Sequence, residues 1–117
     1  MKKVLICDDA LAMRLIMKKQ IENMGHEVVG QAADGEEAVL MYKEFKPDVV
    51  TMDITMPKKT GIEALREIVA FDSQAKVVMV SAMGQEERVK ESILSGAKNF
   101  VVKPFTPEKL EEVINKV

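Results

Sequence analysis

The sequence is poor in several residue types, and each shortage excludes a class of protein. A single cysteine, Cys7, cannot form an internal disulfide, which argues against a disulfide-stapled secreted protein and for the reducing cytoplasm. No apolar run approaches the roughly 20 residues of a membrane span, and the run after Lys2-Lys3 is too short for a signal peptide because it stops at Asp8-Asp9. With one tyrosine, four phenylalanines and nine methionines, the core is expected to be aliphatic and soft.

Positive charge is not in excess either. The 17 Lys and Arg residues against 19 Asp and Glu residues give a formal net charge of −2. This balance lacks the basic footprint of a nucleic-acid-binding protein and the polybasic patch of a membrane-surface protein. The 117 residues, of which 47% are hydrophobic, are expected to form one domain, residues 1–117.

Short apolar runs alternate with amphipathic segments five times. The runs are typical of strands buried on both faces, at residues 4–7, 27–32, 49–52, 76–81 and 99–102. Each is followed by a predicted helix, three of which start at the N-caps Asp34, Thr60 and Thr106. Ile16 and Phe45 are expected on the inner faces of the first two helices. The alternation predicts an α/β fold, a parallel sheet with helices on both faces.

Four of the five predicted strands end in a residue that can bind a charged ligand: Asp8-Asp9, Asp53, Ser81 and Lys103. Ligands of an open α/β sheet bind at the carboxyl ends of its strands. The run 27–32 ends without such a residue, as expected of an edge strand. If the other four strands are neighbours, three carboxylates, a hydroxyl and an ammonium group converge.

These residue types indicate a metal-assisted reaction of a phosphoryl group. Three carboxylates close together require a counter-charge, and oxygen ligands without His or Cys suit Mg²⁺. With Mg²⁺ and Lys103 the formal charges sum to zero, so the site can accept a dianion. Asp53, after a buried strand, is the expected nucleophile because carboxylates form acyl phosphates.

The ordered set Asp8-Asp9, Asp53, Ser81-Ala82 and Lys103-Pro104 resembles the receiver domain of two-component response regulators, most closely the stand-alone chemotaxis receivers. Each motif alone is common, but the ordered set is highly specific, and the resemblance covers the whole chain. It implies a flavodoxin-like (βα)5 three-layer sandwich. It also implies a five-stranded parallel sheet of order 2-1-3-4-5.

The resemblance also implies roles for the strand-end residues. Asp53 would accept a phosphoryl group from the phosphohistidine of a histidine kinase, so the protein would be a switch rather than an enzyme. The implied Mg²⁺ ligands are Asp8, Asp9, Asp53 and the backbone carbonyl of Thr55, with Asp8 acting largely through water. Lys103 would contact the phosphoryl group.

The implied switch lies on the other side of the site. Ser81 would move towards the phosphoryl group, Phe100 would turn inward, and the peptide bond before Pro104 would be cis. Position 100 is often Tyr in chemotaxis receivers, so with Phe100 the switch would depend on packing alone. Thr55 and Met83 would tune the lifetime of the phosphorylated state.

The implied partners are a histidine kinase, a flagellar motor switch protein and a phosphatase, with no nucleic acid or membrane. The fourth helix, fifth strand and fifth helix would form the partner-binding surface of a cytoplasmic monomer. A receiver of another two-component pathway, or one cut from a longer regulator, would have the same sequence pattern.

Other interpretations of these residues remain open. Asp8 or Asp9 alone would be expected to cap the first helix. A Mg²⁺-dependent phosphatase of the haloacid dehalogenase type would carry its nucleophile on the first strand, with a second acid two residues later. A flavin-binding flavodoxin would need a Ser/Thr/Gly-rich loop where this chain has Asp8-Asp9. His26 is expected at the surface without a partner, and residues 85–88 as a solvated helix start.

Overall fold

A computed structural model describes all 117 residues as five strands and five helices in strict alternation. The elements are β1 (Lys3–Cys7), α1 (Leu11–Asn23), β2 (Glu27–Ala32), α2 (Gly35–Phe45), β3 (Val49–Asp53), α3 (Gly61–Phe71), β4 (Val77–Ser81), α4 (Glu86–Leu94), β5 (Asn99–Val102) and α5 (Pro107–Asn115). The predicted alternation is confirmed. One boundary bears on function: β3 extends through Asp53, so this carboxylate belongs to the strand itself.

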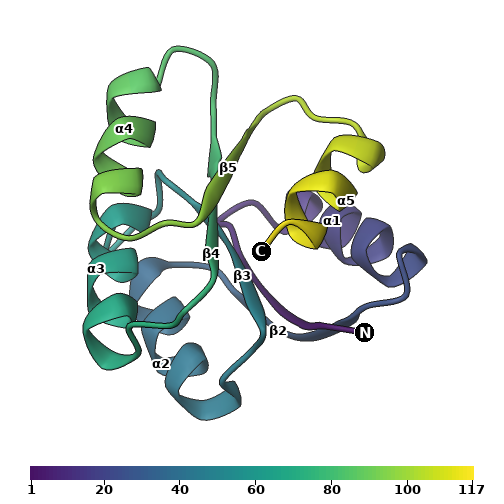
Figure 1. Ribbon diagram of the computed structural model, residues 1–117, viewed down its shortest axis with the longest axis horizontal. Coiled ribbons are helices and arrows are strands. Elements are labelled where there is room, and N and C mark those ends of the chain that lie inside the picture. The colour runs from purple at the N-terminus through teal and green to yellow at the C-terminus, as the bar shows by residue number, and fades with distance from the viewer.

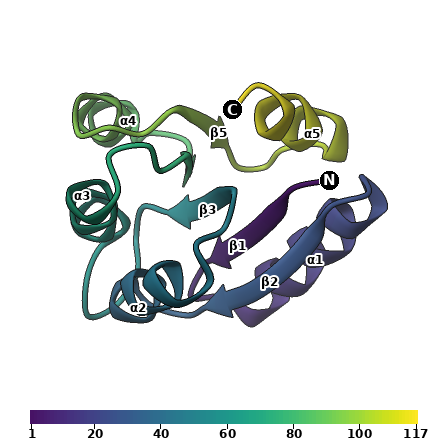
Figure 2. The same ribbon diagram turned by 60° about the horizontal axis from the view of Figure 1, so that its bottom comes forward.

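All five strands are parallel, in the order β2-β1-β3-β4-β5. Helices α1 and α5 cover one face of the sheet, and α2, α3 and α4 cover the other (Figure 1). Figure 2 shows the same two layers of helices from a second direction. The three-layer fold and the strand order implied by the resemblance are therefore confirmed, and β2 is an edge strand as expected.

Two hydrophobic cores lie on the two faces of the sheet. Alternate residues of β1 separate into them, with Leu5 and Cys7 in the larger core and Val4 and Ile6 in the smaller. The larger core contains 18 buried residues and includes the inner faces of α2 and α3, whereas the smaller contains 11 and includes those of α1 and α5. Burial on both faces explains why the strands are continuous apolar runs rather than alternating ones.

Three of the helices begin at the predicted N-caps. Asp34 accepts a hydrogen bond from the Glu37 N–H at 2.8 Å, and Thr106 caps α5 in the same way. Thr60 forms a reciprocal capping box with Glu63. Helix α1 differs, because its N-cap is Ala10 and no side chain caps it. The first helix is thus not capped by the Asp8-Asp9 pair.

Two side chains expected on inner faces are largely exposed. Ile16 is 51% exposed because α1 contacts the sheet along a narrow stripe that contains Met17 and Ile21, one turn apart. Phe45, in the last turn of α2, is 40% exposed. Its ring lies against Gly30 of β2, where a Cβ would be 3.2 Å away, and the edge strand covers only one side of it.

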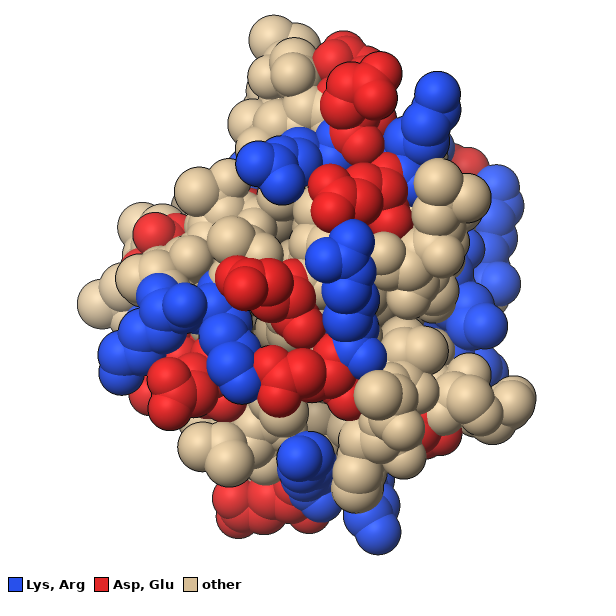
Figure 3. All heavy atoms as spheres, turned by 90° about the vertical axis from the view of Figure 1, so that its left-hand side faces the viewer, with Lys and Arg blue, Asp and Glu red and all other residues tan.

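The surface over α2, α3 and α4 carries Lys and Arg interleaved with Asp and Glu (Figure 3). Ion pairs such as Lys59–Glu67 and Arg66–Glu91 contribute to this pattern. This face therefore does not present a patch of one sign, as a nucleic acid would require. None of the helices has both the length and the apolar character needed to span a membrane.

Candidate functional site

Three carboxylates meet at the carboxyl edge of the sheet, where β1 and β3 lie side by side. Asp8 and Asp9 follow β1, and Asp53 is the last residue of β3. One carboxylate oxygen from each lies within 4.8 Å of the others. Asp8 is fully buried, Asp53 is 9% exposed and Asp9 faces solvent. The predicted convergence of the three acids is present.

Lys103 reaches this cluster from the end of β5. Its Nζ donates to Asp8 Oδ2 at 3.0 Å and lies 3.7 Å from Asp53 Oδ2. The backbone at Lys103 is held against β4 by a hydrogen bond from the Lys103 N–H to the Ser81 carbonyl at 2.7 Å. The Lys103–Pro104 peptide bond is cis. The ammonium group therefore neutralises two of the three acids directly.

Asp8 has a partner at each carboxylate oxygen. Oδ1 accepts from the Ala10 N–H at 2.9 Å, and Oδ2 accepts from Lys103. Its backbone carbonyl accepts from the Arg14 guanidinium at 2.7 Å, which also contacts Gln31 of β2. Sequence reasoning missed Arg14, because nothing in the pattern indicates that an arginine in α1 turns back to the preceding loop. Asp8 is thus a fixed anchor of the site.

The environment of Asp53 disfavours its ionised form. Burial is the main cause that raises the pKa of Asp53, to about 6, and the neighbouring Asp8 and Asp9 charges add to it. The Lys103 ammonium and the Thr55 N–H act in the opposite direction. A carboxylate that lacks solvation and has like charges beside it gains from any further cation bound there.

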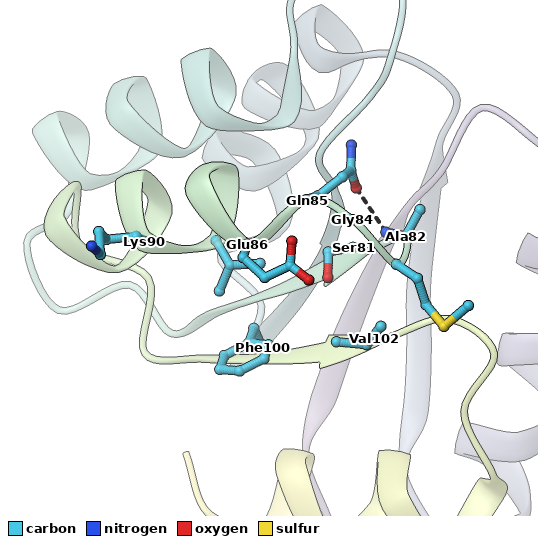
Figure 4. A pocket seen from close by; sticks show the side chains of 10 residues that line it. Ser81, Ala82, Gly84, Gln85, Glu86, Lys90, Phe100 and Val102 are labelled. Atoms are coloured by element: carbon cyan, nitrogen blue, oxygen red, sulfur yellow. Dashed lines mark hydrogen bonds between the residues drawn. The ribbon is translucent and has the colours of Figure 1, made fainter.

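Ser81 and Phe100 lie on the β4–β5 side of the site. Ser81 is 1% exposed, and its Oγ has no hydrogen-bond partner. A cavity of about 410 Å³ opens beside it between β5 and the start of α4, and Figure 4 shows Ser81 and Phe100 on its walls. The Phe100 side chain is 40% exposed, and Met83 at the cavity rim is 76% exposed. Phe100 therefore lies beside an open space.

Gln85 also belongs to the surroundings of the site, which corrects its interpretation as part of a solvated helix start. Its Oε1 accepts from the Ala82 N–H at 2.7 Å, and its Nε2 donates to Thr55 Oγ1 at 3.2 Å. The contact joins two loops that are 30 residues apart in the chain, so no local pattern in the sequence could reveal it.

Two further chemically active side chains lie outside the site. His26 has a partner, contrary to expectation, because its Nδ1 accepts from the Lys2 N–H at 3.0 Å near the amino end of β1. Cys7 is buried next to Asp8, and burial raises the pKa of its thiol, which keeps it protonated. Neither residue contributes a reactive group to the carboxylate cluster.

The cluster fits a small divalent cation. Its donors are carboxylate oxygens without His or Cys, the set that Mg²⁺ prefers. The three oxygens lie within 4.8 Å of one another, so side chains of this cluster could hold one such ion. The unpaired Ser81 hydroxyl and the Lys103 ammonium are donors on the same rim and suit an oxyanion.

The fold and this site define a class of protein. Residues 4–115 match the family described as the response regulator receiver domain, and the chain belongs to that family. Among its relatives are chemotaxis proteins. The chain is 54% identical to the chemotaxis protein CheY of Thermotoga maritima, over 99% of this chain and 97% of that protein. It is 51% identical to CheY of Bacillus subtilis, over 97% of this chain and 95% of that protein.

Solved structures agree with these relatives. The crystal structure of the CheX–CheY–BeF3–Mg²⁺ complex from Borrelia burgdorferi contains a chain with a TM-score of 0.93 and 41% identity. The match covers 97% of this chain and 87% of that chain. The resemblance to receiver domains, and within them to chemotaxis proteins, is therefore confirmed.

Proposed function

We propose that this protein is a phosphorylation-activated switch of a chemotaxis-type two-component system, with Asp53 as the phosphoryl acceptor. The observation that carries the proposal is the meeting of Asp8, Asp9 and Asp53 with Lys103 at one edge of the sheet. The unpaired, buried Ser81 hydroxyl beside them supports it. Asp9 faces solvent at this edge, which suits access by a partner protein.

In the proposed reaction a carboxylate oxygen of Asp53 attacks the phosphorus of a phosphohistidine on the kinase. The new O–P bond forms as the P–N bond breaks, and the imidazole keeps the electron pair and takes up a proton. Lys103 compensates the charge of the transferred group, and the Ser81 hydroxyl donates to one of its oxygens. Hydrolysis of the acyl phosphate then resets the switch.

Asp9, Asp53 and the backbone carbonyl of Thr55 would hold Mg²⁺ directly. Asp8, whose oxygens already have partners at Ala10 and Lys103, would act through water. When bound, Mg²⁺ supplies the positive charge that neutralises the phosphoryl oxygens.

The proposed output surface is α4, β5 and α5. Phe100 of β5 borders the 410 Å³ cavity beside Ser81, which leaves room for its ring to turn inward when Ser81 moves. Thr55 and Met83, two residues beyond Asp53 and Ser81, are placed to tune the lifetime of the phosphorylated state. The partners proposed are a chemotaxis-type histidine kinase, a flagellar motor switch protein and a phosphatase, all in the cytoplasm.

Incubation with acetyl phosphate and Mg²⁺ tests the acceptor. Mass spectrometry is expected to find one phosphoryl group on Asp53 and none in Asp53→Asn. The exposed-carboxylate variant Glu44→Gln on α2 should label like the wild type. Undiminished labelling of Asp53→Asn would disprove the assignment.

The pathway needs a second experiment, because receivers of other two-component systems share this site. The protein, with and without beryllofluoride as a phosphoryl mimic, is presented to purified chemotaxis kinase and to the motor switch protein of the same organism. We expect transfer from the kinase, and motor-switch binding that depends on the mimic. Transfer from an unrelated kinase alone would instead favour another pathway.

A further inference from the structure

Strands β3 and β4 part immediately beyond Asp53. The last ladder bond runs from the Ile54 N–H to the Val80 carbonyl at 3.2 Å. In a continuing parallel ladder, the Ala82 N–H would next donate to the Ile54 carbonyl. Instead, the Ile54 carbonyl accepts from the Gly61 N–H at 2.8 Å, and the Ala82 N–H is left to another acceptor.

The acceptor is Gln85, whose amide spans the gap between the two strands. Its Oε1 binds the Ala82 N–H at 2.7 Å, the bond drawn in Figure 4, and its Nε2 binds Thr55 Oγ1 at 3.2 Å. Backbone groups of alternate residues in a strand point the same way, and the Val80 carbonyl points to β3. The Ala82 N–H is therefore directed towards β3, the strand that ends in Asp53.

We propose that Gln85 is a latch on the phosphoryl site: it occupies the Ala82 N–H in the free protein and yields it to a phosphoryl oxygen on Asp53. This inference rests on the proposed function of Asp53. A hydrogen bond to an anionic oxygen is roughly twice as strong as one to a neutral amide, so the exchange favours the phosphorylated state. The buried Ser81 hydroxyl, unpaired next to Ala82, is a second donor that the same group can engage.

The exchange also links the site to α4. Gln85 is the N-cap of α4 but makes no side-chain cap bond, so the helix does not depend on its amide. Releasing the amide would loosen the tie between the start of α4 and the β3–α3 loop at Thr55. Gln85 lines both the 410 Å³ cavity at β5 and a 190 Å³ cavity at that loop, so its amide has space to move into.

The test compares adduct formation in three variants titrated with beryllofluoride in the presence of Mg²⁺. Gln85→Ala frees the Ala82 N–H in advance, so half-saturation should occur at an about three- to tenfold lower concentration, the worth of one neutral hydrogen bond. Thr55→Val removes only the hydrogen bond between Gln85 Nε2 and Thr55 Oγ1. It should therefore lower the half-saturating concentration by a smaller factor than Gln85→Ala does. Gln74→Ala, in the turn before β4 at the opposite end of that strand, is the control and should match the wild type.

Nitrogen-15 NMR of the wild type supplies a readout that does not depend on a variant folding. The side-chain amide of Gln85 and the backbone amide of Ala82 should both shift on adduct formation, and neither should shift in Asp53→Asn.

Equal or weaker binding by Gln85→Ala, or a Gln85 amide that does not respond in the wild type, would overturn the latch and leave the switch standing. If the wild type forms no adduct at Asp53, the proposed function fails and the latch with it. A poorly folded Gln85→Ala, detected by thermal melting, leaves the decision to the wild-type NMR result.

Discussion

At the scale of single residues, the site is a set of charges that stabilise one another only in part. Asp53 is nearly buried beside Asp8 and Asp9, with a single ammonium group, Lys103, near it. Its pKa of about 6 in the folded protein lies above the ordinary value of 3.8. Ionised Asp53 therefore lowers the stability of the fold.

Replacement of Asp53 by Asn should stabilise the protein at neutral pH without metal. Because the folded pKa is raised, the penalty of ionised Asp53 is full above pH 6 and disappears below pH 3.8. Its upper limit is ~3 kcal/mol, which solvent screening at the open side of the site reduces to ~1–2 kcal/mol. Urea denaturation in EDTA at pH 7.5 and pH 4.5 measures the free energy of unfolding of both proteins. The extra stability of Asp53→Asn over the wild type should be smaller at pH 4.5. An advantage that is the same at both pH values would contradict the raised pKa.

Lys103→Met should destabilise the protein at neutral pH. The substitution keeps an unbranched stem but removes the ammonium that Asp8 and Asp53 both contact. Asp8 would retain only the Ala10 N–H as a partner, and the loss is expected to be ~1–3 kcal/mol. The loss should diminish as the pH falls and Asp53 takes up a proton. Lys109→Met, at an exposed lysine of α5, serves as the matched control in the same denaturation series and should change stability little.

At the scale of elements, the turns that join the strands to their helices shape the edge of the sheet where the proposed site lies. The β3–α3 turn closes tightly because Gly61 at the start of α3 donates to the Ile54 carbonyl. A Cβ on Gly61 would lie 1.9 Å from the Asp53 carbonyl oxygen, closer than any real contact. The absence of a side chain at Gly61 therefore lets α3 begin directly against the strand that carries Asp53, the proposed acceptor.

Gly61→Ala should thus damage both stability and phosphorylation. The neighbouring atoms are backbone, so either α3 or the end of β3 must move, at a cost of ~2–4 kcal/mol. Gly25→Ala, where φ is +90° but no atom lies within 4 Å, should cost only ~1 kcal/mol and leave phosphorylation intact. Thermal melting and acetyl phosphate labelling measure the two effects. A Gly61→Ala protein that melts no earlier than Gly25→Ala would refute the argument from close approach.

At the scale of the whole molecule, the strand order creates the site. Because β1 lies next to β3, Asp9 and Asp53 come within reach of one ion although they are 44 positions apart in the chain. The two cores hold the sheet from both sides, so the carboxyl edge can remain open and polar. The negative charge of the three carboxylates that Lys103 does not neutralise can be neutralised by a cation bound at this edge.

Addition of Mg²⁺ should therefore stabilise the folded protein. At ten times the dissociation constant, binding to the native state alone contributes ~1.4 kcal/mol. The expected result is a higher denaturation midpoint with Mg²⁺, reversed by EDTA and lost in Asp9→Asn. Asp9 is exposed and contacts little else, so that variant should fold normally without metal. Equal stabilisation of Asp9→Asn by Mg²⁺ would show that the ion binds elsewhere.

The sequence by itself determined the alternation of elements, the N-caps Asp34, Thr60 and Thr106, and which strands end in Asp, Ser or Lys. Those features are local: burial on both faces makes a strand apolar throughout, and caps satisfy the N–H groups of the first turn. The strand order came from the resemblance rather than from periodicity, because no local pattern says which strands pair.

Only the tertiary structure decided how the side chains at the site are paired. Asp8 is anchored by Lys103 from 95 residues away, the Gln85 amide reaches Thr55, and Phe100 faces outward beside a cavity. Ile16 and Phe45 likewise lie more exposed than their helix spacing indicates. The partners and the exposure of these side chains depend on where the turns and neighbouring elements lie in the folded protein and on what packs against each side chain. Such positions arise from contacts between segments remote in the chain, which neither composition nor periodicity encodes.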